Sequence, residues 1–293
     1  MHSKMTNQAE HHNFMRVALA WQGSVTPRIL RGVVLCSVYT FTVFYIDAHY
    51  YKLPRFAVTP FEYTGAILGL VLVFRTNAGH ERWWEARKLW GAITNQIRNM
   101  LVMTWHYGEE NLAWRREMTK WLVTFAYASK ASLRMQTDFE EIATWLSADE
   151  ISDLKKTPHA PLFVSSKIAS LLDTAKNRQQ IDLFLFTEFE KQRSALMESI
   201  GGCERIVKTP MPLVYAIKTR RFILLYLLLL PFSLLDEAGT FAPFIAFLVA
   251  YPLLSVDRIG LELQNPFAKQ NLSHLPLDTL CEGINNNARM MQK

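Results

Sequence analysis

The stretch Thr59–Gly91 reads TPFEYTGAILGLVLVFRTNAGHERWWEARKLWG and joins two helical patterns without a break. Its first part, residues 60–74, is apolar apart from Glu62 and opens with a proline, which is favoured in the first turn of a helix. From Trp83 to Leu101 apolar residues recur every three or four positions, with charged residues between them. We therefore predict one long helix that begins as a membrane span at residues 60–76 and continues into the cytoplasm to about residue 105.

Three further apolar segments flank this stretch, at residues 29–46, 221–235 and 240–256. Each is shorter than the ~20 residues that an isolated helix needs to cross a bilayer, so a soluble protein with buried core helices is the alternative. Basic residues at the ends of the apolar segments favour membrane spans, because positive charges are retained on the cytoplasmic side. They are Arg28, Arg31, Arg75, Arg82, Lys218, Arg220 and Arg221.

The positions of these charges predict the topology. Spans one and two are joined by the short loop 47–55, and spans three and four by residues 235–239. The other ends of the spans carry the excess of Lys and Arg, which places them in the cytoplasm. The polar N-terminus lacks the residue order of a cleaved signal peptide. We therefore expect four spans with both termini in the cytoplasm.

The remaining residues form the expected cytosolic part, residues 110–200 and a C-terminal segment, residues 257–293. Periodicity predicts helices over Leu112–Gln136, Asp138–Lys156, Pro161–Leu172 and Arg178–Ser199, with a clear break at residues 157–161. No β-rich segment or repeat is present in the sequence. The predicted fold class is all-α, and we expect a single domain over residues 1–293.

Composition and motifs exclude several classes of protein. Half of the residues are hydrophobic and 20% are charged, and the net charge of +6 is not arranged as a basic stripe with stacking aromatics, which argues against nucleic-acid binding. The three cysteines, Cys36, Cys203 and Cys281, form no CxxC pair, so neither disulfides nor a zinc site are expected. The sequence lacks nucleophile, phosphate-loop and dinucleotide motifs. We expect no enzyme activity, no cofactor and no bound metal.

Several motifs in this order resemble the bestrophin family in its bacterial form, and together they extend from Trp21 to Cys281. They are Thr59–Phe61, Leu72–Asn77, Arg82–Gly91, Gly202–Ile206, Thr209–Tyr215 and Asn265–Phe267. The resemblance implies a homo-pentamer in the cell inner membrane that encloses one central pore. It further implies four spans per subunit, a large helical cytosolic vestibule, and a channel for small monovalent ions in a family that includes chloride channels.

The resemblance also implies the pore-lining residues. The narrow neck of the family falls on Thr59, Tyr63 and Ile67, one helical turn apart, where Thr and Tyr replace bulkier aliphatic residues. A second constriction at the cytosolic exit falls in the helix around Leu183, Phe186 and Phe189, although no motif fixes the residue. The acidic run that binds calcium in animal members is replaced here by residues 268–271, Ala-Lys-Gln-Asn. We therefore expect no calcium gating.

Two readings of these residues stay open. Glu62 either forms a ring of carboxylates near the neck, which favours cations, or caps the helix that starts at Pro60, where the helix dipole stabilises an acid. By spacing alone, Thr59, Tyr63 and Ile67 also fit a packing stripe against a neighbouring helix. For Arg75 we expect a structural role.

The charge selectivity is unresolved, with a slight lean to cations from Glu62. The alternative function is a membrane scaffold that docks a soluble partner. An intramembrane enzyme is disfavoured, because few polar groups lie inside the spans.

Overall fold

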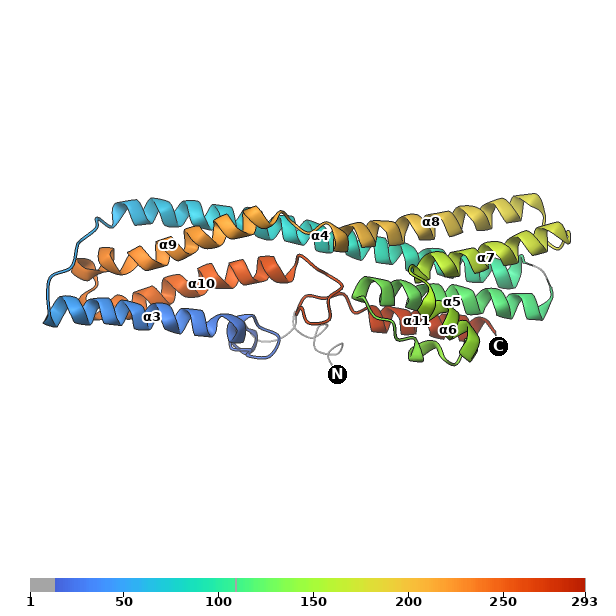
Figure 1. Ribbon diagram of the computed structural model, residues 1–293, viewed down its shortest axis with the longest axis horizontal. Helices are drawn as coiled ribbons and strands as arrows, with labels where there is room; N and C mark the ends of the chain where they lie inside the picture. Colours follow the sequence, from blue (N-terminus) through green and yellow to red (C-terminus); the bar gives the residue numbers. More distant parts are fainter. Residues whose placement is uncertain (1–13, 109, 293) are drawn as a thin grey trace. The chain divides into compact units, whose positions relative to one another are not determined.

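The computed structural model describes residues 14–108 and 110–292, and all regular elements in these ranges are helices (Figure 1). The all-α prediction is therefore confirmed for the described residues. The first thirteen residues, on which part of the expectation for the N-terminus rests, lie outside them.

The chain forms two compact units. Unit 1 comprises Met1–Trp83, Pro210–Pro266 and Gln270–His274, and unit 2 comprises Trp84–Thr209, Phe267–Lys269 and Leu275–Lys293. Helix α4, Thr59–His106, contributes residues to both units and is the predicted long helix. Because the units share this helix, a single domain stays a prediction.

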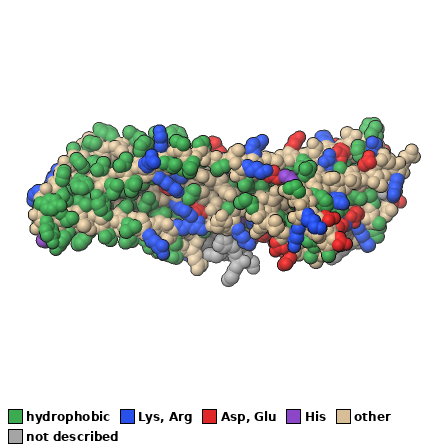
Figure 2. Space-filling model, in the orientation of Figure 1, with side chains coloured by type: hydrophobic (Ala, Val, Ile, Leu, Met, Phe, Trp, Pro, Cys, Tyr) green, Lys and Arg blue, Asp and Glu red, His purple; other side chains and the backbone are tan. Residues whose placement is uncertain are grey.

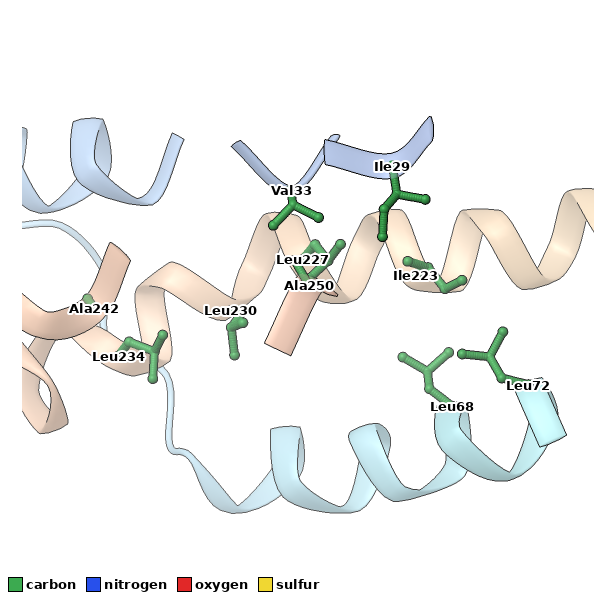
Figure 3. Close-up of a cluster of buried hydrophobic side chains, with 10 residues drawn as sticks. All are labelled: Ile29, Val33, Leu68, Leu72, Ile223, Leu227, Leu230, Leu234, Ala242 and Ala250. Atoms are coloured by element: carbon green, nitrogen blue, oxygen red, sulfur yellow. The ribbon is translucent and has the colours of Figure 1, made fainter. Parts of the chain in front are cut away.

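Unit 1 contains the short helix α2 (Phe14–Ala18), α3 (Thr26–His49), the first half of α4, α9 (Leu213–Glu237), the 3-10 turn η3 (Gly239–Phe241) and α10 (Ala242–Glu262). Its core gathers aliphatic side chains from α3, α4, α9 and α10 (Figure 3). Ala242, Ala246 and Ala250 are buried one turn apart on α10. Such small side chains let neighbouring helices approach closely in a membrane.

The surface of unit 1 is largely apolar. Figure 2 shows hydrophobic side chains spread over this unit, whereas most Asp and Glu side chains lie over unit 2. Large exposed side chains on α3 include Leu35, Val38 and Phe41. An apolar surface of this extent marks contact with lipid or with another protein.

Two helical segments, Thr26–His49 and Gly239–Glu262, are long and apolar enough to cross a membrane. The other two predicted spans lie inside α4 and α9. Glu62 and Arg75 in α4, and the charged ends of α9, lower their apolar character. The count of four spans therefore stays a prediction.

Unit 2 packs helices around α5 (Leu112–Arg134), in which residues 121–131 are all buried. A helix that is buried on every side is the centre of its bundle. The other elements of this unit are the second half of α4, η2 (Glu140–Ile142), α6 (Ala148–Lys156), α7 (Ala160–Asn177), α8 (Leu183–Lys208) and α11 (Leu277–Met291).

The structure corrects three predictions in this unit. The predicted helix Asp138–Lys156 is wrong, because only the turn η2 and then α6 form there. Ser147 and Glu150 make a capping box that starts α6 as a separate helix. Helix α8 continues past Ser199 to Lys208, and α11 forms in the C-terminal segment, where no helix was predicted.

Two buried cations of α5 share an acid of α11. Lys130 Nζ lies 3.1 Å and Arg134 Nη1 2.7 Å from Asp278 Oδ1, and Lys130 Nζ also lies 2.5 Å from Glu141 Oε2. Burial opposes ionisation of Asp278, but the hydrogen bonds from Arg134 and Lys130 outweigh it and lower its pKa from 3.8 to about 2. The ionised carboxylate therefore stabilises the contact between α5 and α11.

This depressed pKa predicts an acid-dependent loss of stability. A group with a lowered pKa in the folded state stabilises fully above its unfolded pKa, and the contribution is lost as the pH falls from about 4 to about 2. We expect Asp278→Asn to be about 1 kcal/mol less stable than the wild type at pH 7, because Arg134 loses its acid, while the 45% exposure of Asp278 lets water screen the pair. Between pH 4 and 2 its melting temperature in detergent should fall less than that of the wild type.

The matched control is Asp173→Asn on the exposed side of α7, where the carboxylate accepts a hydrogen bond from Asn177 and has no other partner among the described residues. Its melting temperature should follow the wild type at every pH. An equal acid response in the Asp278→Asn variant and the wild type would contradict the assignment.

Candidate functional site

The start of α4 is held in place by charged contacts between the flanking segments. Arg55, in the loop before α4, donates to both carboxylate oxygens of Asp47 on α3, at 2.5 and 2.9 Å. Its Nε also donates to Asp236 on α9 at 3.1 Å. The backbone N–H of Phe56 donates to the carbonyl of Phe232 at 3.3 Å. The loop is therefore fastened to α3 and α9 immediately before α4 begins.

Thr59, Tyr63 and Ile67 lie on one exposed face of α4. Tyr63 is 69% and Ile67 62% exposed, whereas Leu68 and Leu72 on the opposite face are buried. Leu70 and Phe74, both exposed, extend the same face. The structure thus brings the predicted neck residues together, outside the core of the chain. Their role in a pore stays a prediction.

Glu62 lies in the first turn of α4 and its side chain is exposed. This position gives the carboxylate a favourable interaction with the helix dipole. Because the Glu62 side chain is exposed, it is equally free to face the water of a pore. Both readings of Glu62 therefore stay open.

An apolar groove of about 390 Å³ runs between α4 and α9 and was not predicted from the sequence. Its walls are Pro60, Phe61, Thr64, Ile67, Leu68 and Val71 of α4, and Phe222, Leu225, Tyr226 and Leu229 of α9. The Tyr226 hydroxyl lies 3.0 Å from the position that a Cβ atom on Gly65 would take, so the glycine permits this approach. The groove is lined mostly by apolar side chains.

Arg75 lies on the buried face of α4 and is 1% exposed. Its Nη1 is paired with Asp257 Oδ1 of α10, and Arg220 Nε of α9 lies 3.2 Å from the other carboxylate oxygen. One acid of α10 therefore joins α4 to α9. The structural role predicted for Arg75 agrees with this contact.

A second buried acid, Glu262, ends α10. It is paired with Arg28 of α3 and, at 2.9 Å, with Arg258. Its other oxygen accepts from the Leu272 backbone N–H at 2.8 Å, and Arg28 also donates to the Gln270 carbonyl at 2.8 Å. Sequence reasoning singled out Arg28 but not Arg258, and it missed both acids. The only signal for them was two acids, five positions apart, at the end of an apolar segment.

The residues predicted for the cytosolic constriction do not share one environment. Leu183 is exposed, Phe186 is half-buried under the Lys176 ammonium at 4.8 Å, and Phe189 is fully buried. Phe189 packs edge-to-face against Trp114, with ring centroids 6.3 Å apart, so it belongs to the core of unit 2. Phe184, which sequence reasoning did not select, is the most exposed aromatic at this end of α8. The constriction stays a prediction, with Leu183 and Phe184 as its accessible candidates.

Metal and thiol chemistry find no support in the part of the chain that the structure describes. No group of three or more His, Cys, Asp or Glu in residues 14–108 and 110–292 could hold a metal ion. Cys36, Cys203 and Cys281 form no disulfide. Burial raises the pKa of the Cys203 and Cys281 thiols to about 12, which keeps them protonated and unreactive.

Comparison with known proteins gives the family from the sequence and the fold from solved structures. The family described as "Bacterial/Fungal Bestrophin protein" matches residues 5–290. A voltage-dependent anion channel-forming protein of Synechocystis sp. is 33% identical over 92% of this chain and 89% of its own length. A protein of the same description from Nostoc sp. is also 33% identical, over 95% of this chain and 91% of its own length. A bacterial bestrophin homologue from Klebsiella pneumoniae has the same fold, with a TM-score of 0.83 at 23% identity over 90% of this chain and 98% of that one.

The buried ion pair of Arg75 predicts a large asymmetry between two substitutions. Asp257→Asn leaves a buried guanidinium without its counter-charge, so we expect a loss of about 3–5 kcal/mol in the free energy of unfolding. Arg220→Gln removes a partner that is 50% exposed, and its cost should stay within about 1 kcal/mol. Thermal unfolding of both variants in one detergent checks the difference, and equal losses would contradict it.

Proposed function

Because the chain belongs to the bacterial and fungal bestrophin family, we propose that it is the pore-forming subunit of an ion channel that passes small monovalent anions. The observation that carries the proposal is the exposed face of α4. Tyr63, Ile67 and Phe74 form a row of large side chains that the chain's own core does not cover. A ring of copies, five by resemblance to the family, would turn this face toward a common axis.

The proposed neck consists of Thr59, Tyr63 and Ile67 from each subunit. Hydrophobic constrictions in channels gate by excluding water, and hydroxyl groups ease their hydration. The Thr59 and Tyr63 hydroxyls make this neck easier to wet than an aliphatic one. We therefore propose that Ile67 is the driest of the three positions and presents the main barrier to ions.

Anions are the proposed cargo for two reasons. The relatives from Synechocystis and Nostoc bear names that describe anion channel formation. In addition, the inner end of the spans has four arginines, Arg28, Arg75, Arg220 and Arg258, around the two acids Asp257 and Glu262. The lean to cations rests on Glu62 alone, and in this proposal Glu62 serves as a helix cap.

We place the protein in the inner membrane with four spans and both termini in the cytoplasm. The basic ends of the apolar helices support this orientation. The helices of unit 2 are then the cytosolic part. A scaffold role is not favoured, since nothing among the relatives points to it.

Flux through purified protein in liposomes tests the proposal. With a potassium chloride gradient, the current should reverse near the chloride equilibrium potential. Ile67→Ala should increase the conductance severalfold, because it removes apolar bulk from the neck. Phe41→Ala on the exposed face of α3 is the matched control and should leave the conductance unchanged.

Glu62→Gln separates the two readings of that residue. An unchanged reversal potential is expected for a helix cap. A shift toward the chloride potential, together with a wild-type current that reverses near the potassium potential, would overturn the anion proposal. No flux from protein shown to be an intact oligomer would overturn the channel proposal itself.

A further inference from the structure

The walls of the apolar groove between α4 and α9 are exposed in the single chain. Phe222, Leu225 and Leu229 of α9 are between 43% and 55% exposed, and Ile67 of α4 is 62% exposed. Tyr226 also lines the groove, and its hydroxyl has no hydrogen-bond partner among the described residues. A hydroxyl away from water is costly unless it finds an acceptor. The groove therefore combines an uncovered apolar surface with one unused donor.

A second exposed surface lies on another side of α4 and consists of Ala66, Gly69 and Val73, which we call the small-residue flank. Their spacing of three and four positions places them on one helix face. Ala66 and Val73 are exposed, and a Cβ atom on Gly69 would meet nothing within 4 Å. Small side chains let another helix approach closely within a membrane. Glu62, four positions before Ala66, stands at the start of the same flank and is exposed.

The exposed row that begins with Tyr63 lies between the groove and the small-residue flank. Successive residues are about 100° apart around an α-helix. Thr64 and Val71 of the groove therefore lie to one side of the row, and Ala66 and Val73 lie to the other. In a ring of copies whose rows face a common axis, one side of each α4 meets the opposite side of the next α4.

The groove and the small-residue flank also occupy the same length of α4. The groove covers residues 60–71 of this helix, and the flank covers residues 66–73. Rotation about an axis along the membrane normal keeps equivalent residues at equal depth, so the two surfaces meet without a shift along the helix. The Tyr226 hydroxyl lies 3.0 Å from the position that a Cβ atom on Gly65 would take. It is therefore within one helical turn of the depth of Glu62.

We propose that the small-residue flank of one copy docks into the groove of the next copy, and that Glu62 accepts a hydrogen bond from the Tyr226 hydroxyl of that copy. The proposal rests on the ring of copies in the proposed function and names the surfaces by which they meet. Two different surfaces join in this contact, and such contacts close into rings. The arrangement leaves Tyr63 and Ile67 free to face the axis.

Disulfide cross-linking in liposomes tests the docked surfaces. A chain that carries both Ala66→Cys and Leu225→Cys offers one cysteine on each surface, so oxidation should give a ladder of covalent species up to the closed ring. Each single variant, which retains the native cysteines, should remain monomeric on the same gel. The matched control combines Leu225→Cys with Phe41→Cys on the exposed face of α3 and should also remain monomeric.

The other outcomes separate this contact from the channel proposal. Covalent dimers alone would indicate a two-fold contact and would overturn the docking. So would the absence of cross-links in an oligomer that is intact and conducts ions, a result that leaves the proposed function standing. A phospholipid that co-purifies with that oligomer and is displaced by Leu225→Trp would identify an acyl chain as the occupant instead. A complete ladder from protein without flux would keep the contact and overturn the channel.

A double-mutant cycle tests the hydrogen bond. Tyr226→Phe removes only the hydroxyl, and Glu62→Ala removes the acceptor. Each should raise the protein concentration at which half of the oligomer dissociates in detergent by about fivefold, as expected for the loss of one hydrogen bond per contact. The double variant should be no weaker than either single variant, because the partners are coupled.

The control for this cycle is Thr64→Val, since the Thr64 hydroxyl donates to the Pro60 carbonyl of its own helix at 2.7 Å. Its effect should multiply with that of Glu62→Ala. If the effects of Tyr226→Phe and Glu62→Ala also multiply, the two side chains are not in contact and the proposed hydrogen bond is wrong.

Discussion

Hydrocarbon offers no partner to a backbone N–H or C=O group, and unit 1 follows from that constraint. Each of its apolar segments is a helix, which satisfies the backbone internally, and the large side chains point outward as readily as inward. The core of unit 1 is correspondingly small, because the alanines of α10 let the neighbouring helices approach closely without large side chains between them. Unit 2 has the opposite organisation. It buries α5 on all sides and exposes acids and bases, as expected for a bundle in water.

The same constraint explains where the charges lie. At one end of unit 1, Asp257 and Glu262 are buried and each is paired with two arginines, and the pair of Arg75 with Asp257 is shielded from water. The exposed row on α4 needs no such pairing, because it carries no charge between Tyr63 and Phe74. Charge is thus concentrated near the ends of the apolar segments, and the stretch of α4 between Tyr63 and Phe74 remains available for an apolar lining. This distribution supports the pore-lining face proposed for α4.

Periodicity was sufficient to predict α4, since its apolar residues keep a helical spacing from Pro60 to Leu101 and nothing interrupts it. It failed at residues 138–156, where Ser147 and Glu150 cap a new helix in the middle of an apparently continuous pattern. Helix α11 was missed because two of its buried residues, Ile284 and Ala288, are separated by a run of three asparagines. For the site, spacing placed Thr59, Tyr63 and Ile67 on one face. It could not find the partnership of Arg75 with Asp257, which lie 182 positions apart. Spacing also could not show that Trp114 packs against Phe189, which places Phe189 in the core of unit 2.

The ion pairs of Arg55 are more exposed to water than the ion pair of Arg75, so they respond more strongly to salt. Arg55 holds the start of α4 through Asp47 and through Asp236, whose side chain is largely exposed, so dissolved ions reach this fastening. Salt weakens exposed ion pairs far more than buried ones. Raising the ionic strength should therefore loosen the end of unit 1 that holds Arg55, while the end that holds Arg75 and Asp257 stays rigid. The first turns of α4, including Thr59 and Tyr63, lie directly after these salt-sensitive ion pairs.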